Sequence, residues 1–105
     1  MKTTKKITKQ DITTDPITVG NAVFIRTVTM NHVGRIKSIK KDAILLEDDA
    51  WVAETGARVG EFLATGKLKG QYNAEIERTP GTVRVNPETI IDAFHWMHAL
   101  PLESQ

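Results

Sequence analysis

One short segment carries side chains suited to holding an anion. Thr55, Gly56 and Arg58 lie at the expected start of a helix, where free backbone N–H groups and the helix dipole attract negative charge. Arg58 can donate two hydrogen bonds to one phosphate. Trp51, shortly before Thr55, offers a face on which a base can stack. The same pattern also describes an ordinary helix cap, which is its commoner use.

A second group of cations fills a turn and the strand before it. Lys40 and Lys41 stand in a polar turn, and Arg35 and Lys37 share one parity on the preceding segment, which places them on one face of a strand. An oligomer would repeat this patch and attract phosphate despite a small net charge; a merely solubilising surface is the alternative. The candidate ligand-binding residues are Arg58, Thr55, Gly56, Trp51, Lys40, Lys41 and Arg35.

The densest acidic group offers weaker chemistry. Glu47, Asp48, Asp49 and Glu54 follow an apolar segment. Paired carboxylates can bind a hard cation or share a proton, which would allow metal-assisted hydrolysis. Acidic residues at the end of a strand more often form a solvated turn, and no calcium loop, glycine-rich phosphate loop or nucleophile motif accompanies them. We therefore expect a protein that is not an enzyme.

The histidines do not form a convincing metal site. His95 and His98 flank Trp96 at a spacing that places them on opposite faces of a strand. We expect Trp96 to pack as an apolar cover and the two histidines to make local hydrogen bonds. The sequence thus predicts no metal and no cofactor.

Composition limits the possible functions further. The chain has 105 residues, 14 Lys and Arg against 13 Asp and Glu, and no cysteine, as expected for one small domain without disulfides or a thiol nucleophile. No apolar run approaches the ~18 residues of a membrane span, and no signal sequence is visible. We expect a cytoplasmic protein with no membrane partner.

The elements that must position these residues are mostly strands. β-branched and apolar residues predict short antiparallel strands over residues 23–29, 33–39, 43–47, 82–86 and 89–96. Gly34, inside one of them, indicates a bend or a bulge, while Asn31 and His32 are expected in or near a turn. The predicted fold class is mainly β (β-rich α+β): a small five-stranded Sm/SH3-like antiparallel barrel with one inserted short helix.

The remaining segments complete the domain organisation. Residues 1–16 have the composition of a flexible basic tail, and residues 17–105 form the single barrel domain. Apolar spacing at Val59, Phe62 and Leu63 predicts a helical insertion around 55–66, which Gly66 can end. Residues 67–81 fit either an edge hairpin arm or an irregular loop.

The order of residues from Gly34 to Glu47 resembles the first motif of Sm-like proteins, particularly the Hfq-type bacterial RNA chaperones. Shared features are a bent strand, a short turn at Lys40–Asp42 and the apolar strand beginning at Ala43. Residues 89–93 resemble the shorter second motif, whose strand joins the next subunit in that family. The resemblance implies a homo-oligomer, with a ring as one form, and RNA as a ligand.

The whole chain is also similar to small uncharacterised proteins of tailed bacteriophages, through Val33-Gly34-Arg35, residues 45–51, Glu54-Thr55-Gly56 and residues 91–101. This resemblance implies an accessory protein in the host cytoplasm. The expected function is non-catalytic binding of a nucleotide-class ligand, either RNA or a nucleotide immune signal sequestered as a sponge for anti-defence. The alternative is a structural or host-protein-interaction factor anchored by Trp51, Trp96 and the Val59, Phe62 and Leu63 face.

Overall fold

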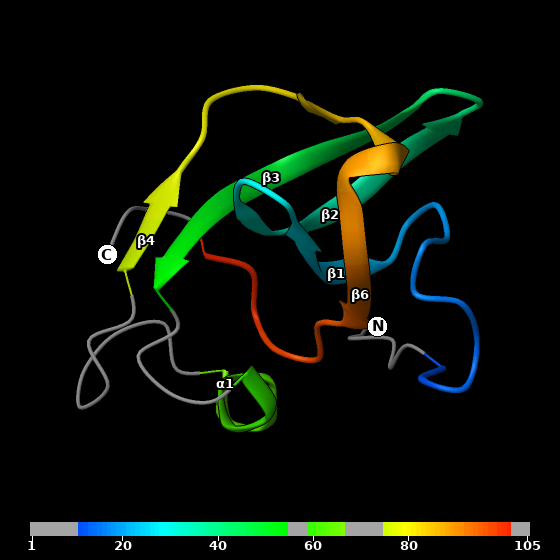
Figure 1. Ribbon diagram of the computed structural model, residues 1–105. Helices are drawn as coiled ribbons and strands as arrows, with labels where there is room; N and C mark the ends of the chain where they lie inside the picture. Colours follow the sequence, from blue (N-terminus) through cyan, green and yellow to red (C-terminus); the bar gives the residue numbers. More distant parts are fainter. Residues whose placement is uncertain (1–10, 55–58, 67–74, 102–105) are drawn as a thin grey trace, which may run out of the picture.

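The computed structural model describes residues 11–54, 59–66 and 75–101, and within them the protein is mainly β. Six antiparallel strands and one short helix replace the five strands expected from the sequence (Figure 1). In chain order the elements are β1 (Ala22–Thr27), β2 (Asn31–Lys40), β3 (Ala43–Glu54), α1 (Val59–Thr65), β4 (Glu75–Arg78), β5 (Val83–Val85), a 3-10 turn (Pro87–Thr89) and β6 (Ile90–His95).

All strands belong to one sheet with the order β4-β3-β2-β1-β6, and β5 also pairs with β3. Strand β2 occupies one edge of β3 over almost its full length. Strands β4 and β5 therefore share the other edge, β5 opposite residues 44–46 and β4 opposite residues 50–54. The long β2–β3 hairpin is thus the central unit of the sheet (Figure 1).

Strand β1 is buried on both faces. Ala22 and Phe24 point into one apolar cluster, whereas the alternating residues Val23 and Ile25 point into another. The first cluster contains Ala22, Phe24, Val33, Ala50, Val52, Phe62, Ile76 and Trp96, and the second contains Val23, Ile25, Ile36, Ile44, Leu46 and Val85. Since alternate residues of a strand lie on opposite faces, the two clusters cover opposite faces of the sheet at β1.

Strand β3 carries one extra residue in its middle. Val33 pairs with Ala50 and Arg35 with Glu47, so Gly34 alone faces both Asp48 and Asp49. Asp48 takes a positive φ of 52°, a conformation that Asp tolerates better than most residues. The extra residue reverses the alternation of β3. Even-numbered residues before it, such as Leu46, therefore lie in the second cluster, and those after it lie in the first.

The structure confirms the irregularity predicted at Gly34. Asn31 and His32 begin β2 directly after the turn that joins it to β1, so they lie near a turn, as expected, but belong to the strand. Within residues 67–81, residues 75–78 form strand β4, while residues 67–74 lie outside the described part of the chain. Helix α1 begins at Val59, and the preceding residues 55–58 of the predicted helix also lie outside it.

Hydrogen bonds close the last turn of α1 and form the turns of the segment before β1. Gly66, at a φ of 64°, ends α1 as predicted and donates its N–H to the Phe62 carbonyl at 2.8 Å. In the predicted tail, residues 1–10 lie outside the described part of the chain. Residues 11–16 form turns in which Asp11 accepts from Thr13 and Asp15 accepts from Ile17.

Substitution of Gly34 tests the close packing at the bulge. A Cβ on Gly34 would lie 3.1 Å from the Asp49 Cα and 3.3 Å from the Glu47 carbonyl oxygen. Both are backbone atoms of the ladder, so we expect Gly34→Ala to lower the free energy of unfolding by about 1–3 kcal/mol, the usual cost of overpacking. Urea denaturation followed by circular dichroism measures this change.

Gly60→Ala is the matched control. Gly60 lies in α1, and a Cβ there meets nothing within 4 Å, so the same substitution should be neutral or raise stability by up to about 1 kcal/mol. Equal stability changes at the two glycines would contradict the close approach at Gly34.

Candidate functional site

The structure separates the candidate ligand-binding residues that it describes. Lys40 ends β2 and Lys41 follows it in the hairpin turn, whereas Trp51 lies near the other end of the hairpin, opposite His32. The distance from His32 to Lys40 along β2 is roughly 26 Å at the usual rise per strand residue. One chain therefore does not bring Lys40 and Lys41 next to Trp51. The remaining helix-start candidates Thr55, Gly56 and Arg58 lie outside the described residues.

Arg35 has a local structural contact. Its Nη1 donates to the Gly20 carbonyl at 2.8 Å and so ties the segment before β1 to β2. The register of β2 against β3 also shifts between Ile36 and Ser38, so the simple alternation expected for Arg35 and Lys37 is interrupted between them. Lys37 instead reaches toward the Thr82 hydroxyl, with Nζ at 3.5 Å.

Cations gather at the hairpin end of the sheet. Lys40 and Lys41 are exposed and take part in none of the ion pairs between described residues. Lys37 lies before them, and Arg84 on β5 lies opposite Leu45. Arg84 Nη2 is 3.5 Å from Asp42 Oδ2, but both side chains are mostly exposed, where such a pair contributes little. We call Lys37, Lys40, Lys41 and Arg84 the basic end.

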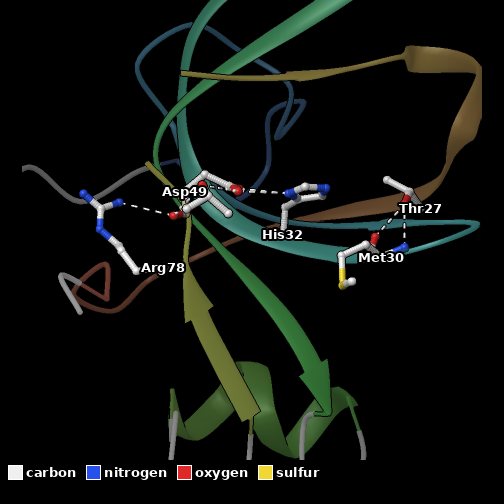
Figure 2. A network of polar contacts seen from close by, with 6 residues as sticks. Thr27, Met30, His32, Asp49 and Arg78 are labelled. Carbon is white, nitrogen blue, oxygen red and sulfur yellow. Dashed lines mark hydrogen bonds and ion pairs between the residues drawn. The ribbon is translucent and has the colours of Figure 1, made fainter. Parts of the chain in front are cut away.

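A buried polar network, which was not predicted from the sequence, lies at the bulge. Asp49 is fully buried and His32 nearly so. His32 Nδ1 lies 3.0 and 3.1 Å from the two Asp49 carboxylate oxygens. The buried Thr79 hydroxyl lies 3.0 Å from Asp49 Oδ2 and 3.1 Å from the Asp49 carbonyl oxygen. Each polar side chain of the network thus has a partner (Figure 2).

The end of β4 holds the backbone of the bulge. Arg78 extends toward it (Figure 2), with Nη1 donating to the Asp49 carbonyl at 3.2 Å and Nη2 to Asp48 Oδ1 at 3.3 Å. The Thr79 N–H donates to the same Asp49 carbonyl at 3.0 Å. A bulge leaves backbone groups outside the regular ladder, and here residues 78 and 79 supply partners for the Asp49 carbonyl.

The bulge also places Trp51 beside His32. The two residues are directly opposite each other on β3 and β2, so their side chains lie on the same face, with Cβ atoms about 5 Å apart. Trp51 is 38% exposed, whereas Trp96 is 2% exposed. Trp51 is therefore an accessible aromatic surface. Trp96, expected as an apolar cover or as an anchor for a partner protein, is part of the core.

Two members of the predicted acidic group, Asp48 and Asp49, already have partners at the bulge. Asp49 accepts from His32 and Thr79, and Asp48 pairs with Arg78. Within the described residues no three His, Cys, Asp or Glu side chains are arranged to hold a metal ion.

The C-terminal histidines contact backbone carbonyl groups of distant segments. His95 Nε2 lies 2.9 Å from the Thr14 carbonyl oxygen, and His98 Nε2 lies 2.7 Å from that of Leu63. Trp96 packs against Phe62 with ring centroids 5.3 Å apart, and its indole N–H donates to the Ala99 carbonyl at 3.1 Å. Trp96 packs as an apolar cover, as predicted. The histidines do make hydrogen bonds, but their partners lie 81 and 35 positions away along the chain rather than nearby in sequence.

One ion pair joins β1 to β6. The Arg26 guanidinium donates from Nε and Nη2 to the two carboxylate oxygens of Asp92. It also lies 6.0 Å from the centroid of the Phe94 ring. The hydrogen bond from Arg26 lowers the pKa of Asp92, and the same bond raises the pKa of Arg26. The pair therefore stays charged across the neutral range and holds β6 in register.

Comparisons with known proteins give no relative. No family model matches the chain, and neither a curated protein nor a solved structure is significantly similar to it. In the described part of the chain, no helix has the length and apolar character needed to cross a membrane.

Asp49→Asn tests the energetic role of the network. An amide keeps the shape of the side chain but has one acceptor oxygen where the carboxylate has two, carries no negative charge, and places an NH2 donor beside His32 or Thr79. Removing one partner of a buried pair is costly, so we expect the free energy of unfolding to fall by about 2–4 kcal/mol. The exposed Asp42→Asn is the control, with an expected change within about 0.5 kcal/mol. Similar changes for the two variants would contradict a stabilising network.

Proposed function

We propose that this protein is a non-catalytic, homo-oligomeric barrel of Sm/SH3 type that binds a nucleotide-class ligand through its phosphates. The basic end is the observation that carries the proposal. It presents four cations from two strands and one turn, with Asp42 as the carboxylate paired among them. Clustered Lys and Arg side chains on one surface are the electrostatic footprint of a phosphate-binding protein.

The strand arrangement supports the barrel part of the proposal. Strands β4 and β5 share one edge of β3, and β1 is covered on both faces. The bulge on β3 increases local twist and bends the strand. A sheet that curls in this way forms the wall of a small barrel, as in the Sm-like proteins that the hairpin resembles.

RNA is the member of the nucleotide class that fits the spacing best. The accessible Trp51 and the basic end are separated by roughly 26 Å along one hairpin. Single strands occupy about 4–16 nucleotides on small barrels, so one RNA can reach both places on one chain. A nucleotide immune signal would need Trp51 and the lysines from different subunits, which makes a sponge the second candidate.

Homo-oligomerisation is supported by the edge strand β6. Among described residues β6 pairs with β1 alone. The backbone N–H of Trp96 donates to the Ala22 carbonyl. Hydrogen-bonded and non-hydrogen-bonded residue pairs alternate along an antiparallel ladder, so the backbone N–H and C=O of Ala93 point away from β1. Ile91 on this strand is 61% exposed, and Val28 at the nearby turn is 68% exposed. An exposed edge with apolar side chains is suited to pairing with a second copy.

The phage and host assignments are proposals from the sequence resemblance. In this view the protein is an accessory factor in the cytoplasm of the bacterial host, acting on RNA or in anti-defence. The host-protein alternative has less support, because Phe62 and Trp96, two of its proposed anchors, are 1% and 2% exposed in the protein's own core.

The salt dependence of RNA binding tests the phosphate contacts. Each lysine lost from a single-strand phosphate should reduce the slope of log K against log salt by about 0.7. We expect this reduction for Lys41→Gln, measured by fluorescence anisotropy of a labelled RNA. Ile12→Glu, at a 64% exposed position, changes the net charge by the same amount and should leave the slope unchanged. Equal slopes for wild type and Lys41→Gln would refute a contact at Lys41.

The subunit interface is tested separately by Ile91→Lys. The added charge should prevent pairing along β6 without affecting the core, because Ile91 is exposed. Native mass spectrometry should show an oligomer for the wild type and a monomer for the variant. A wild-type protein that is already monomeric would contradict the oligomer, and an Ile91→Lys oligomer would contradict this interface.

A further inference from the structure

His32 is a nearly buried side chain with one end anchored and the other open. The residue is 7% exposed, and Nδ1 is held by the Asp49 carboxylate. In the described part of the chain, Nε2 makes no hydrogen bond, yet no buried side-chain nitrogen or oxygen lacks a partner. Nε2 is therefore not fully buried, and it belongs to the small part of His32 that is exposed at the surface.

The anchored end determines what the open end can do. A carboxylate only accepts hydrogen bonds, so the His32 tautomer that fits its contact with Asp49 carries the proton on Nδ1. In the neutral imidazole Nε2 then carries a lone pair and accepts. Asp49 is held in turn by Thr79, which fixes the plane of the imidazole as well as its tautomer.

Trp51 lies next to this acceptor. The direct pairing of His32 with Trp51 places both side chains on one face of the sheet, and Trp51 is 38% exposed. An aromatic plane beside a fixed acceptor is what recognition of a nucleobase uses, since the base stacks while its edge is read by hydrogen bonds.

We propose that Trp51 and His32 form a nucleobase-recognition site, in which a base stacks on the Trp51 indole and donates an edge N–H to His32 Nε2. The site deepens the proposed function, on which it rests, because it adds base contacts to the phosphate contacts of the basic end. Its ligand class is an unpaired nucleobase with an N–H at the contacted edge, such as the exocyclic amine of adenine.

The test compares two probes on the full chain. One is an eight-nucleotide oligoadenylate, and the other is the abasic ribose-phosphate polymer of the same length. The variant His32→Asn keeps an N–H that can reach Asp49 at the position of Nδ1 but removes Nε2. Trp51→Leu keeps an apolar side chain but removes the stacking face.

We expect the wild type to bind oligoadenylate more tightly than the abasic polymer. Trp51→Leu should weaken oligoadenylate binding about tenfold or more, and His32→Asn about fivefold. Neither should change affinity for the abasic polymer or the salt slope, and the retained abasic binding shows that each variant is folded. Binding should also change the tryptophan fluorescence of the wild type but not of Trp51→Leu.

Two outcomes would overturn the proposal, and they differ. Equal wild-type affinity for both polymers, unchanged in both variants, would remove the base site but leave phosphate binding intact. A folded wild type that binds neither polymer would remove the proposed RNA-binding function and the base site together. A loss of affinity for both polymers in His32→Asn would assign His32 a structural role and also refute a base contact.

Discussion

The extra residue that β3 carries opposite Gly34 determines how the rest of the sheet is arranged. Before it, Ile44 and Leu46 lie in one apolar cluster; after it, Ala50 and Val52 lie in the other. Without this reversal, one half of β3 would present its polar residues to the core. The bulge fits here because Gly34 has no Cβ to meet the Asp49 backbone and because Asp48 accepts a positive φ.

The polar network follows from the same reversal. It turns Asp49 and Trp51 to the face on which His32 lies, and it buries Asp49 completely. A buried carboxylate requires partners, and these come from β2 and from the end of β4 at Arg78 and Thr79. The bulge therefore links the β2–β3 hairpin to β4, which lies more than twenty residues further along the chain. One local irregularity thus connects the packing of the core with the exposed side chain of Trp51.

Periodicity predicted the strands well because alternation is a local property. The first strands, the helix over Val59, Phe62 and Leu63, and the irregularity at Gly34 all follow from residue type and short spacing. The continuation of β3 through Trp51 was missed because an inserted residue cancels the alternation by which strands are recognised. Strand β4 was left undecided because its pairing with β3 is a long-range contact.

The candidate site was only partly predictable for the same reason. Lys40 and Lys41 stand in a turn that the sequence marks clearly, and Trp51 was selected as an aromatic. The sequence offers no signal for the network, because His32 and its partner Asp49 are 17 positions apart and Thr79, which bonds Asp49, lies 30 positions beyond Asp49. No local sequence pattern relates such residues, because they are brought together only by the register of β2, β3 and β4 in the sheet. The arrangement also separates Trp51 from Lys40 and Lys41, which lie at the other end of the β2–β3 hairpin.

The side of the sheet on which Trp51 lies tests this account most directly. Nuclear Overhauser contacts of the Trp51 indole, measured in solution, report its neighbours on either face. The bulge predicts contacts between the Trp51 and His32 rings and none between Trp51 and Phe24, which lies in the opposite cluster. Contacts of Trp51 with Phe24, without contacts to His32, would show that β3 alternates without the extra residue and would contradict the account.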